Sequence, residues 1–145
     1  VRIQLIMDFQ VIIDNLPLYF QGLWTTVQLV LISLVVGLCL AIPIALLAAS
    51  KNRWVNIVPK AYIYFFRGTP LLVQMYMIYH GMGQFEFIHD SFLWTIFKEA
   101  YACALIAFAL NTAGYTGEIL RGTIEQTLFG EIEAAKACGM SVPMI

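Results

Sequence analysis

The chain alternates between long apolar stretches and short charged ones. Three stretches carry no formal charge, and they cover residues 15–50, 68–85 and 100–117. A helix needs about 20 apolar residues to cross the hydrocarbon core of a bilayer, and backbone groups in lipid must be hydrogen-bonded within the segment. The pattern therefore predicts an all-α, multi-pass membrane protein with about three transmembrane helices here, at about 23–50, 61–83 and 100–116.

Within these spans, proline and small residues predict local features. Pro43 is expected to kink or shorten the first helix. Arg67-Gly68-Thr69-Pro70 interrupts the first third of the second. In the first helix small residues recur every fourth position, at Gly37, Ala41, Ala45 and Ala49. This stripe predicts a face that packs closely against another helix, although small residues are also frequent in membrane helices generally.

Composition agrees with a membrane protein and excludes several other classes. The chain is 61% hydrophobic and 12% charged, whereas soluble domains are about a quarter charged. Residues 29–40 do not alternate between apolar and polar side chains, which argues against a membrane β-barrel. There is no basic run, so we expect no nucleic-acid partner. Three scattered cysteines without a CxxC pair predict neither a disulfide framework nor a metal site, and no cofactor is expected.

The charged loops predict the orientation in the membrane. The region after the first span carries Lys51, Arg53, Lys60 and Arg67, whereas the loop before the third span carries only Lys98 among its cations. Because Lys and Arg accumulate on the cytoplasmic side, the first region is predicted inside and the second outside. The N-terminus is then outside, and the residues after about 117 are cytoplasmic. Arg67 lies near the cytoplasmic end of the second predicted span, and a charge at this position is explained if the side chain extends to the membrane–water interface.

A cytoplasmic segment with many small residues, 130–139, is the most informative part of the chain. Ala134 and Ala135 leave little bulk, so this predicted helix can press closely against another protein. Gly139 can adopt the left-handed conformation that ends a helix. From composition alone, an ordinary solvated amphipathic helix at the membrane is the favoured interpretation.

Three motifs resemble one known family. Tyr115-x-x-Glu118-Ile119-x-Arg121-Gly122, followed by Gly130-Glu131-x-Glu133-Ala134-Ala135-x-x-x-Gly139, resembles the EAA signature of the permeases of ATP-binding-cassette (ABC) importers that depend on a binding protein. Residues 66–74 resemble the second signature of the polar amino-acid branch, which includes histidine, arginine and opine permeases. Residues 22–26 resemble that branch's entry to the first span. Leu128 stands where the family commonly has Pro, and Glu131 where Gln is common, so the entry to the EAA helix departs from the pattern.

The resemblance implies the type I ABC importer permease fold, with five transmembrane helices and the EAA helix after the third. We therefore expect that this sequence is the N-terminal part of one permease domain, that 117–145 is its coupling segment, and that two further spans are missing. The implied partners are a separate ATPase, a second permease subunit that is identical or paralogous, and a periplasmic or extracellular substrate-binding protein. The implied location is the bacterial inner membrane. The residues expected to contact the ATPase are Gly130, Glu133, Ala134, Ala135 and Gly139.

The resemblance also implies a transport subunit that is not an enzyme. Gly117 and Gly122 have the spacing of a P-loop, but the lysine of that motif is absent, which agrees with a chain that has no nucleotide site of its own. The alternative is an ion-coupled secondary amino-acid carrier. Such a carrier needs a carboxylate near mid-membrane, whereas Glu118 lies at the inner edge of the predicted span.

Polar residues in the spans are candidates for the transport pathway. Asn111, Tyr115 and Glu118 share one face of the third helix, and Gln74 lies in the second. Polar groups at membrane depth face protein or water rather than lipid. These residues either line the pathway or simply bond neighbouring helices. The sequence does not say which amino acid is carried, although a basic amino acid or an opine is favoured.

Overall fold

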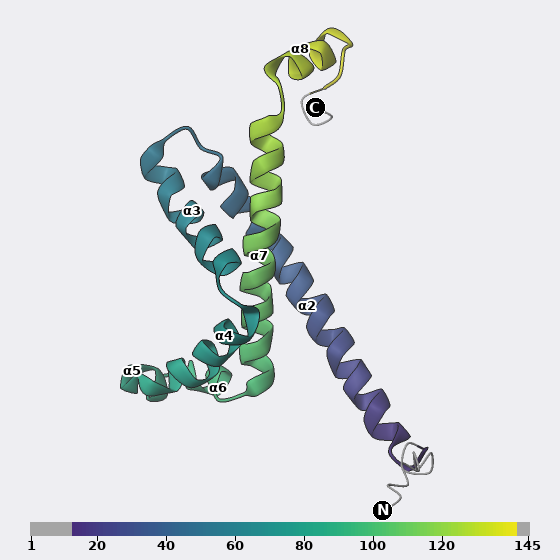
Figure 1. The fold of residues 1–145 in the computed structure, drawn as a ribbon, viewed down its shortest axis with the longest axis vertical. Helices are drawn as coiled ribbons and strands as arrows, with labels where there is room; N and C mark the ends of the chain where they lie inside the picture. Colours follow the sequence, from purple (N-terminus) through teal and green to yellow (C-terminus); the bar gives the residue numbers. More distant parts are fainter. Residues whose placement is uncertain (1–12, 142–145) are drawn as a thin grey trace, which may run out of the picture.

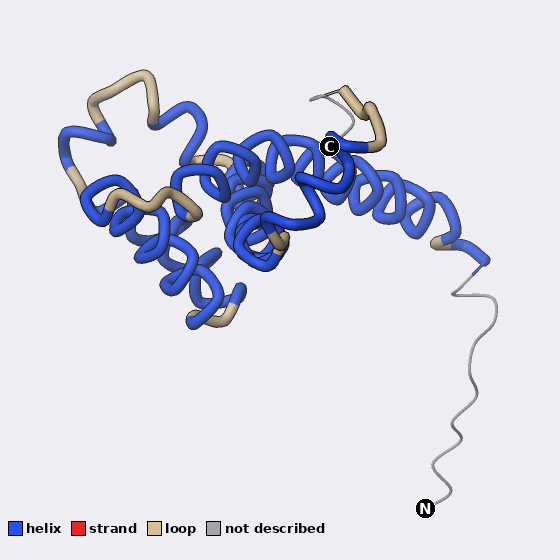
Figure 2. The backbone as a smooth tube through the Cα atoms, turned by 90° about the horizontal axis from the view of Figure 1, so that it is seen from above, coloured by secondary structure: helices blue, strands red, loops and turns tan. Residues whose placement is uncertain are grey.

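The computed structural model describes residues 13–141, and all the regular structure in that range is helical (Figures 1 and 2). The predicted outward N-terminus and the last residues of the coupling segment lie outside this range. In chain order the elements are α2 (Leu16–Ala48), α3 (Arg53–Gly68), α4 (Leu71–Tyr76), the π-helical η1 (Met77–Gly81), the 3-10 turn η2 (Met82–Gln84), α5 (Glu86–His89), α6 (Trp94–Phe97), α7 (Ala100–Gln126) and α8 (Phe129–Ala137).

Helices α2 and α7 are the two that are long and apolar enough to cross a membrane among the described residues. Helix α2 begins at Leu16, earlier than predicted, because Pro17 falls in its first turn, where a missing N–H costs nothing. Pro43 does not end the helix, which continues to Ala48. Most large apolar side chains of α2 are exposed, as expected for a helix that faces lipid.

The region of the second predicted span is not one continuous helix. Helix α3 ends at Gly68, and Thr69 is extended, with φ −109° and ψ 137°. The cause is Pro70, which lacks a backbone N–H and disfavours the helical conformation of the residue before it. Helix α4, η1 and η2 continue the chain beyond this break, which lies where the sequence predicts it.

Small residues allow α2 and α7 to cross closely. In α2 the buried residues include Gly37, Ala41 and Ala45, which confirms the predicted packing stripe. Its last buried member is Ala48 rather than Ala49, which is only partly buried. A Cβ atom on Gly37 would lie 2.7 Å from the Cβ of Thr112 in α7, so only glycine fits at this crossing.

Helix α7 continues beyond the end of the third predicted span at about 116. Its charged residues after Gly117 pair along the helix, since Arg121 binds both Glu118 and Glu125 one turn away on either side. The loop between α2 and α3 lies toward the end of α7 that carries α8, whereas α5 and α6 lie at the opposite end (Figure 1). The loop that carries Lys51 and the small-residue helix α8 therefore share one end of the molecule, whereas Arg53, Lys60 and Arg67 belong to α3 rather than to a loop.

Candidate functional site

The break between α3 and α4, here called the break segment (residues 66–74), is held together by one buried amide. Gln74 is 3% exposed, and its Nε2 donates to the carbonyl oxygens of Phe66 and Thr69, at 2.9 Å each. The same nitrogen lies 2.7 Å from Thr69 Oγ1. A helix end leaves carbonyls without helical partners, and here a side chain from the next helix supplies the donor.

Helix α7 is tied to this break by a second amide. Asn111 Nδ2 donates to Gln74 Oε1 at 3.2 Å and to the Phe66 carbonyl at 3.4 Å. The adjacent Tyr62 hydroxyl, from α3, donates to the Leu110 carbonyl of α7 at 2.7 Å. Close approach depends on Gly114, where an added Cβ would lie 3.0 Å from the Cβ of Phe66. The buried part of the break segment is therefore bonded directly to α7.

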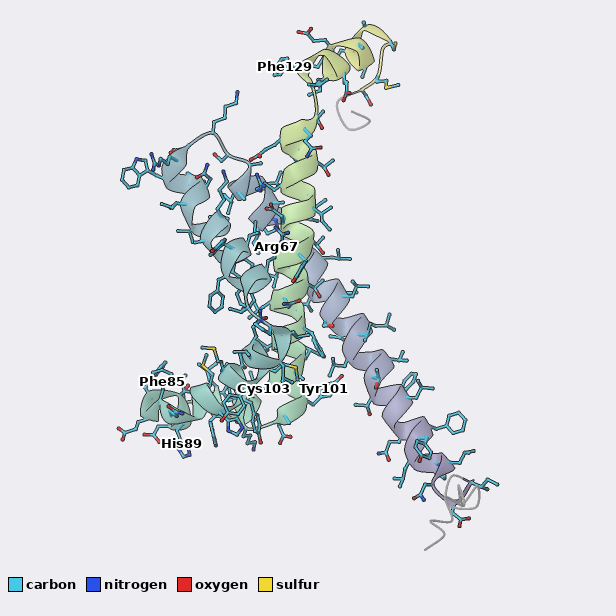
Figure 3. The ribbon with its side chains drawn as sticks, viewed as in Figure 1. Arg67, Phe85, His89, Tyr101, Cys103 and Phe129 are labelled. Atoms are coloured by element: carbon cyan, nitrogen blue, oxygen red, sulfur yellow. The ribbon has the colours of Figure 1, made fainter. Side chains whose placement is uncertain are left out.

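One to two turns further along α7, a charged and more exposed layer contacts the same segment. The Arg67 guanidinium carbon lies 5.7 Å from the ring centroid of Tyr115, and its Nη1 lies 3.3 Å from Glu118 Oε1. Glu118 also accepts two hydrogen bonds from Arg121, at 2.7 and 2.8 Å. Figure 3 shows Arg67 beside α7. The guanidinium is turned to Tyr115 and Glu118, and the extension of this side chain to the interface stays a prediction.

All four predicted pathway residues thus meet at one place. Asn111, Tyr115 and Glu118 lie along one face of α7, and each contacts the break segment, to which Gln74 itself belongs. The sequence placed three of them on one face, but it carried no signal for their partners. Arg67, Thr69 and the Phe66 carbonyl complete the site.

The predicted ATPase-coupling residues lie apart from this site, four of them on α8 and Gly139 two residues beyond its end. This helix projects beyond the end of α7, and Phe129 at its start is 78% exposed (Figures 1 and 3). Gly130, Glu133, Ala134 and Gly139 are exposed, and Ala135 is half-buried. The predicted glycine stop is confirmed, since Gly139 has φ +80°.

The end of α8 is a Schellman motif, which defines the exit of the chain from the helix. The backbone N–H of Gly139 donates to the Lys136 carbonyl at 3.0 Å, and that of Met140 donates to the Ala135 carbonyl at 3.1 Å. These two hydrogen bonds form when residue 139 is in the left-handed conformation, which glycine adopts without steric cost.

No cluster suited to a metal is present within residues 13–141, where His, Cys, Asp and Glu form no group of three. The same part of the chain contains free thiols only, at Cys39, Cys103 and Cys138. What the structure does present is a set of polar contacts between helices and a projecting helix of small residues.

Two long apolar helices, an internally bonded helix break and a projecting helix agree with a polytopic helical membrane protein. Residues 41–145 match the family model described as the binding-protein-dependent transport system inner membrane component, and the chain belongs to this family.

Named relatives and a solved structure agree with this assignment. The nopaline transport system permease protein NocM of Agrobacterium fabrum is 47% identical over 136 residues, which are 93% of this chain and 56% of the relative. The histidine/lysine/arginine/ornithine transport system permease protein HisM of Escherichia coli is 39% identical over 123 residues, which are 84% of this chain and 52% of the relative. A crystal structure of an amino acid ABC transporter with histidines is 32% identical, with a TM-score of 0.75 over 95% of this chain and 60% of that chain.

The chain spans about half the length of the curated relatives it matches. Together, the family and the structural similarity show that it is a part of the type I ABC importer permease fold.

Proposed function

We propose that this chain is part of the permease subunit of an ABC importer for polar amino acids, in the bacterial inner membrane. With a second permease subunit it forms the pathway, a substrate-binding protein delivers the substrate, and a separate ATPase drives the cycle. The observation that carries this proposal is the family match over residues 41–145. The printed names of NocM and HisM favour an opine or a basic amino acid as substrate. Membership of this family also speaks against an ion-coupled secondary carrier.

In the proposed orientation the N-terminus is outside and the residues after about 117 are cytoplasmic. The loop between α2 and α3, which carries Lys51 and leads into Arg53 at the start of α3, lies toward the same end of α7 as α8 (Figure 1). The loop that contains Glu86, Asp90 and Glu99 lies at the other end. This distribution matches the accumulation of Lys and Arg on the cytoplasmic side.

Helix α8 is the surface that docks on the ATPase. Its small side chains, Ala134 and Ala135, permit a close contact, and Glu133 is exposed on the same helix. Gly130 lies in its first turn, where an added Cβ meets nothing within 4 Å, and Gly139 ends it. The exposed Phe129 adds an apolar group that a partner would cover. Force transmitted between subunits needs such a close-packed contact.

Helix α7 carries the movement of α8 to the pathway. It is one continuous helix of 27 residues, and α8 follows it after a connection of two residues, 127 and 128. At Asn111, Tyr115 and Glu118 it is bonded to the break segment. A displacement of α7 therefore moves the break segment with it. In this scheme Gln74, Asn111, Tyr115 and Glu118 support the pathway by positioning the break.

The test of the docking surface uses the complete importer with Ala135→Leu and Gly139→Val. Overpacking a fitted contact costs about 1–3 kcal/mol, and 1.4 kcal/mol is a tenfold loss of association. Gly139→Val also forces a β-branched residue into φ +80°, which alters the exit of the chain. We expect both variants to insert normally, while co-purification of the ATPase and amino-acid uptake fall.

A matched control is Gly22→Val, a glycine in α2 at the other end of the molecule, with nothing within 4 Å of an added Cβ. It should leave ATPase association unchanged. Full association and full uptake in both α8 variants would show that α8 is only a solvated helix at the membrane surface.

A further inference from the structure

Helix α3 carries a line of three cations, and the proposed transport role uses only the last of them, Arg67. Arg53, Lys60 and Arg67 are seven residues apart, which places them on one face of the helix. Two aromatic side chains on the same helix are almost fully exposed, Trp54 at 86% and Tyr64 at 83%. Exposed Trp and Tyr beside Lys and Arg are typical of segments at the membrane–water interface.

A cavity of about 310 Å³ opens beside this line of cations, between α3 and α7. Its lining contains three cations but only one carboxylate. The residues are Lys60, Ile63, Tyr64, Arg67, Glu118 and Arg121. The lining therefore has a surplus of two positive charges, one of which Glu125 compensates through its ion pair with Arg121.

The single carboxylate is already engaged. Both oxygens of Glu118 accept hydrogen bonds from Arg121, at 2.7 and 2.8 Å. Arg67 reaches Glu118 through one nitrogen only, at 3.3 Å. Among the described residues Lys60 forms no ion pair within 4.0 Å. Donors on Lys60 and Arg67 thus remain available to an oxyanion in the cavity.

We propose that this cavity binds the phosphate group of an anionic phospholipid in the cytoplasmic leaflet, with Lys60 and Arg67 as donors. The proposal rests on the orientation given above, which puts α3 at the inner surface. Basic pockets between helices on that side are suited to lipid headgroups, because the leaflet is anionic. Tyr64 lines the cavity, and Trp54 lies in the first turn of the same helix.

Its position separates this cavity from the buried contacts of the break. Lys60 and Tyr64 are exposed, whereas Gln74 is buried among Phe66, Thr69 and Asn111. A lipid headgroup, which approaches from the surface of the molecule, fits such a flank better than the carboxylate of a transported substrate.

The experiment compares the complete importer in nanodiscs of phosphatidylcholine alone and of phosphatidylcholine with phosphatidylglycerol. Native mass spectrometry counts the phospholipids retained by the wild type, by Lys60→Gln and by Lys60→Arg. The matched control is Lys98→Gln, which removes the same charge from the other end of the molecule. One Lys near an anionic surface is worth about a fivefold change in binding. We therefore expect Lys60→Gln to retain about fivefold less phosphatidylglycerol, and Lys60→Arg and Lys98→Gln to retain as much as the wild type.

Three results would overturn the headgroup site. The first is equal retention of phosphatidylglycerol by Lys60→Gln and the wild type. The second is displacement of the lipid by inorganic phosphate at millimolar concentration, which would assign the site to a free anion. The third is displacement by arginine, which would assign it to the substrate.

The same nanodisc lipids are used in proteoliposomes to measure ATP-driven amino-acid uptake by the wild type. Normal uptake without selective lipid retention would refute the headgroup site alone. Selective retention without uptake would refute the proposed transport function alone.

Discussion

Replacement of Gln74 by Leu tests whether the break segment depends on its buried amide. Leucine has a similar size but can neither donate nor accept a hydrogen bond. In the wild type, Nε2 of Gln74 donates to the carbonyls of Phe66 and Thr69 at 2.9 Å each, and Oε1 accepts from Asn111 at 3.2 Å. Gln74→Leu removes all of these contacts at once.

The magnitude follows from the groups that lose a partner. The Thr69 carbonyl loses its side-chain donor, whereas the Phe66 carbonyl retains a longer contact with Asn111 at 3.4 Å. A buried polar group without a partner costs about 1–3 kcal/mol. The Thr69 carbonyl is left unpaired, and the Phe66 carbonyl and the Asn111 amide keep only their contact with each other. Together these losses should lower the free energy of unfolding by about 2–4 kcal/mol. Lipid offers no replacement donor.

The assay is denaturant unfolding of the purified permease in detergent, combined with uptake in proteoliposomes. Gln28→Leu makes the same chemical change at an exposed position of α2 and should cause no loss of stability. We expect Gln74→Leu to lose both stability and uptake. If it unfolds at the wild-type denaturant concentration and transports normally, the amide is not what holds the break, and the reasoning is refuted.

Three further predictions concern topology, the pathway and the helix crossing. Single cysteines at positions 52 and 90, in a background without native cysteines, should differ in intact cells, with only position 90 labelled by an impermeant reagent; labelling of position 52 from outside would contradict the orientation. Asn111→Leu should reduce uptake, because α7 loses its bond to Gln74; normal uptake would leave Asn111 a role in helix packing only. Gly37→Ala should lower the free energy of unfolding by about 1–3 kcal/mol, since its Cβ would lie 2.7 Å from that of Thr112; wild-type stability in denaturant would contradict the close α2–α7 crossing.

Local features could be predicted because their causes lie in neighbouring residues. The helix break follows from Pro70, whose ring and missing N–H act on the residues immediately before it. The end of α8 follows from Gly139, which alone among the described residues has a positive φ. The small-residue stripe of α2 follows from a helical period, although the period does not decide between Ala48 and Ala49 as its last buried member.

The sequence by itself thus determined the presence of the long apolar helices, the small-residue stripe, the break and the glycine stop, since each depends on residues a few positions apart. The tertiary structure alone decided what the polar residues contact. Asn111 and Gln74 are 37 positions apart, and Arg67 and Glu118 are 51 apart, so no local pattern pairs them. Their meeting depends on how closely α3 and α7 pack, which Gly114 permits beside Phe66. Helix packing therefore converted four separate polar residues into one site at the break.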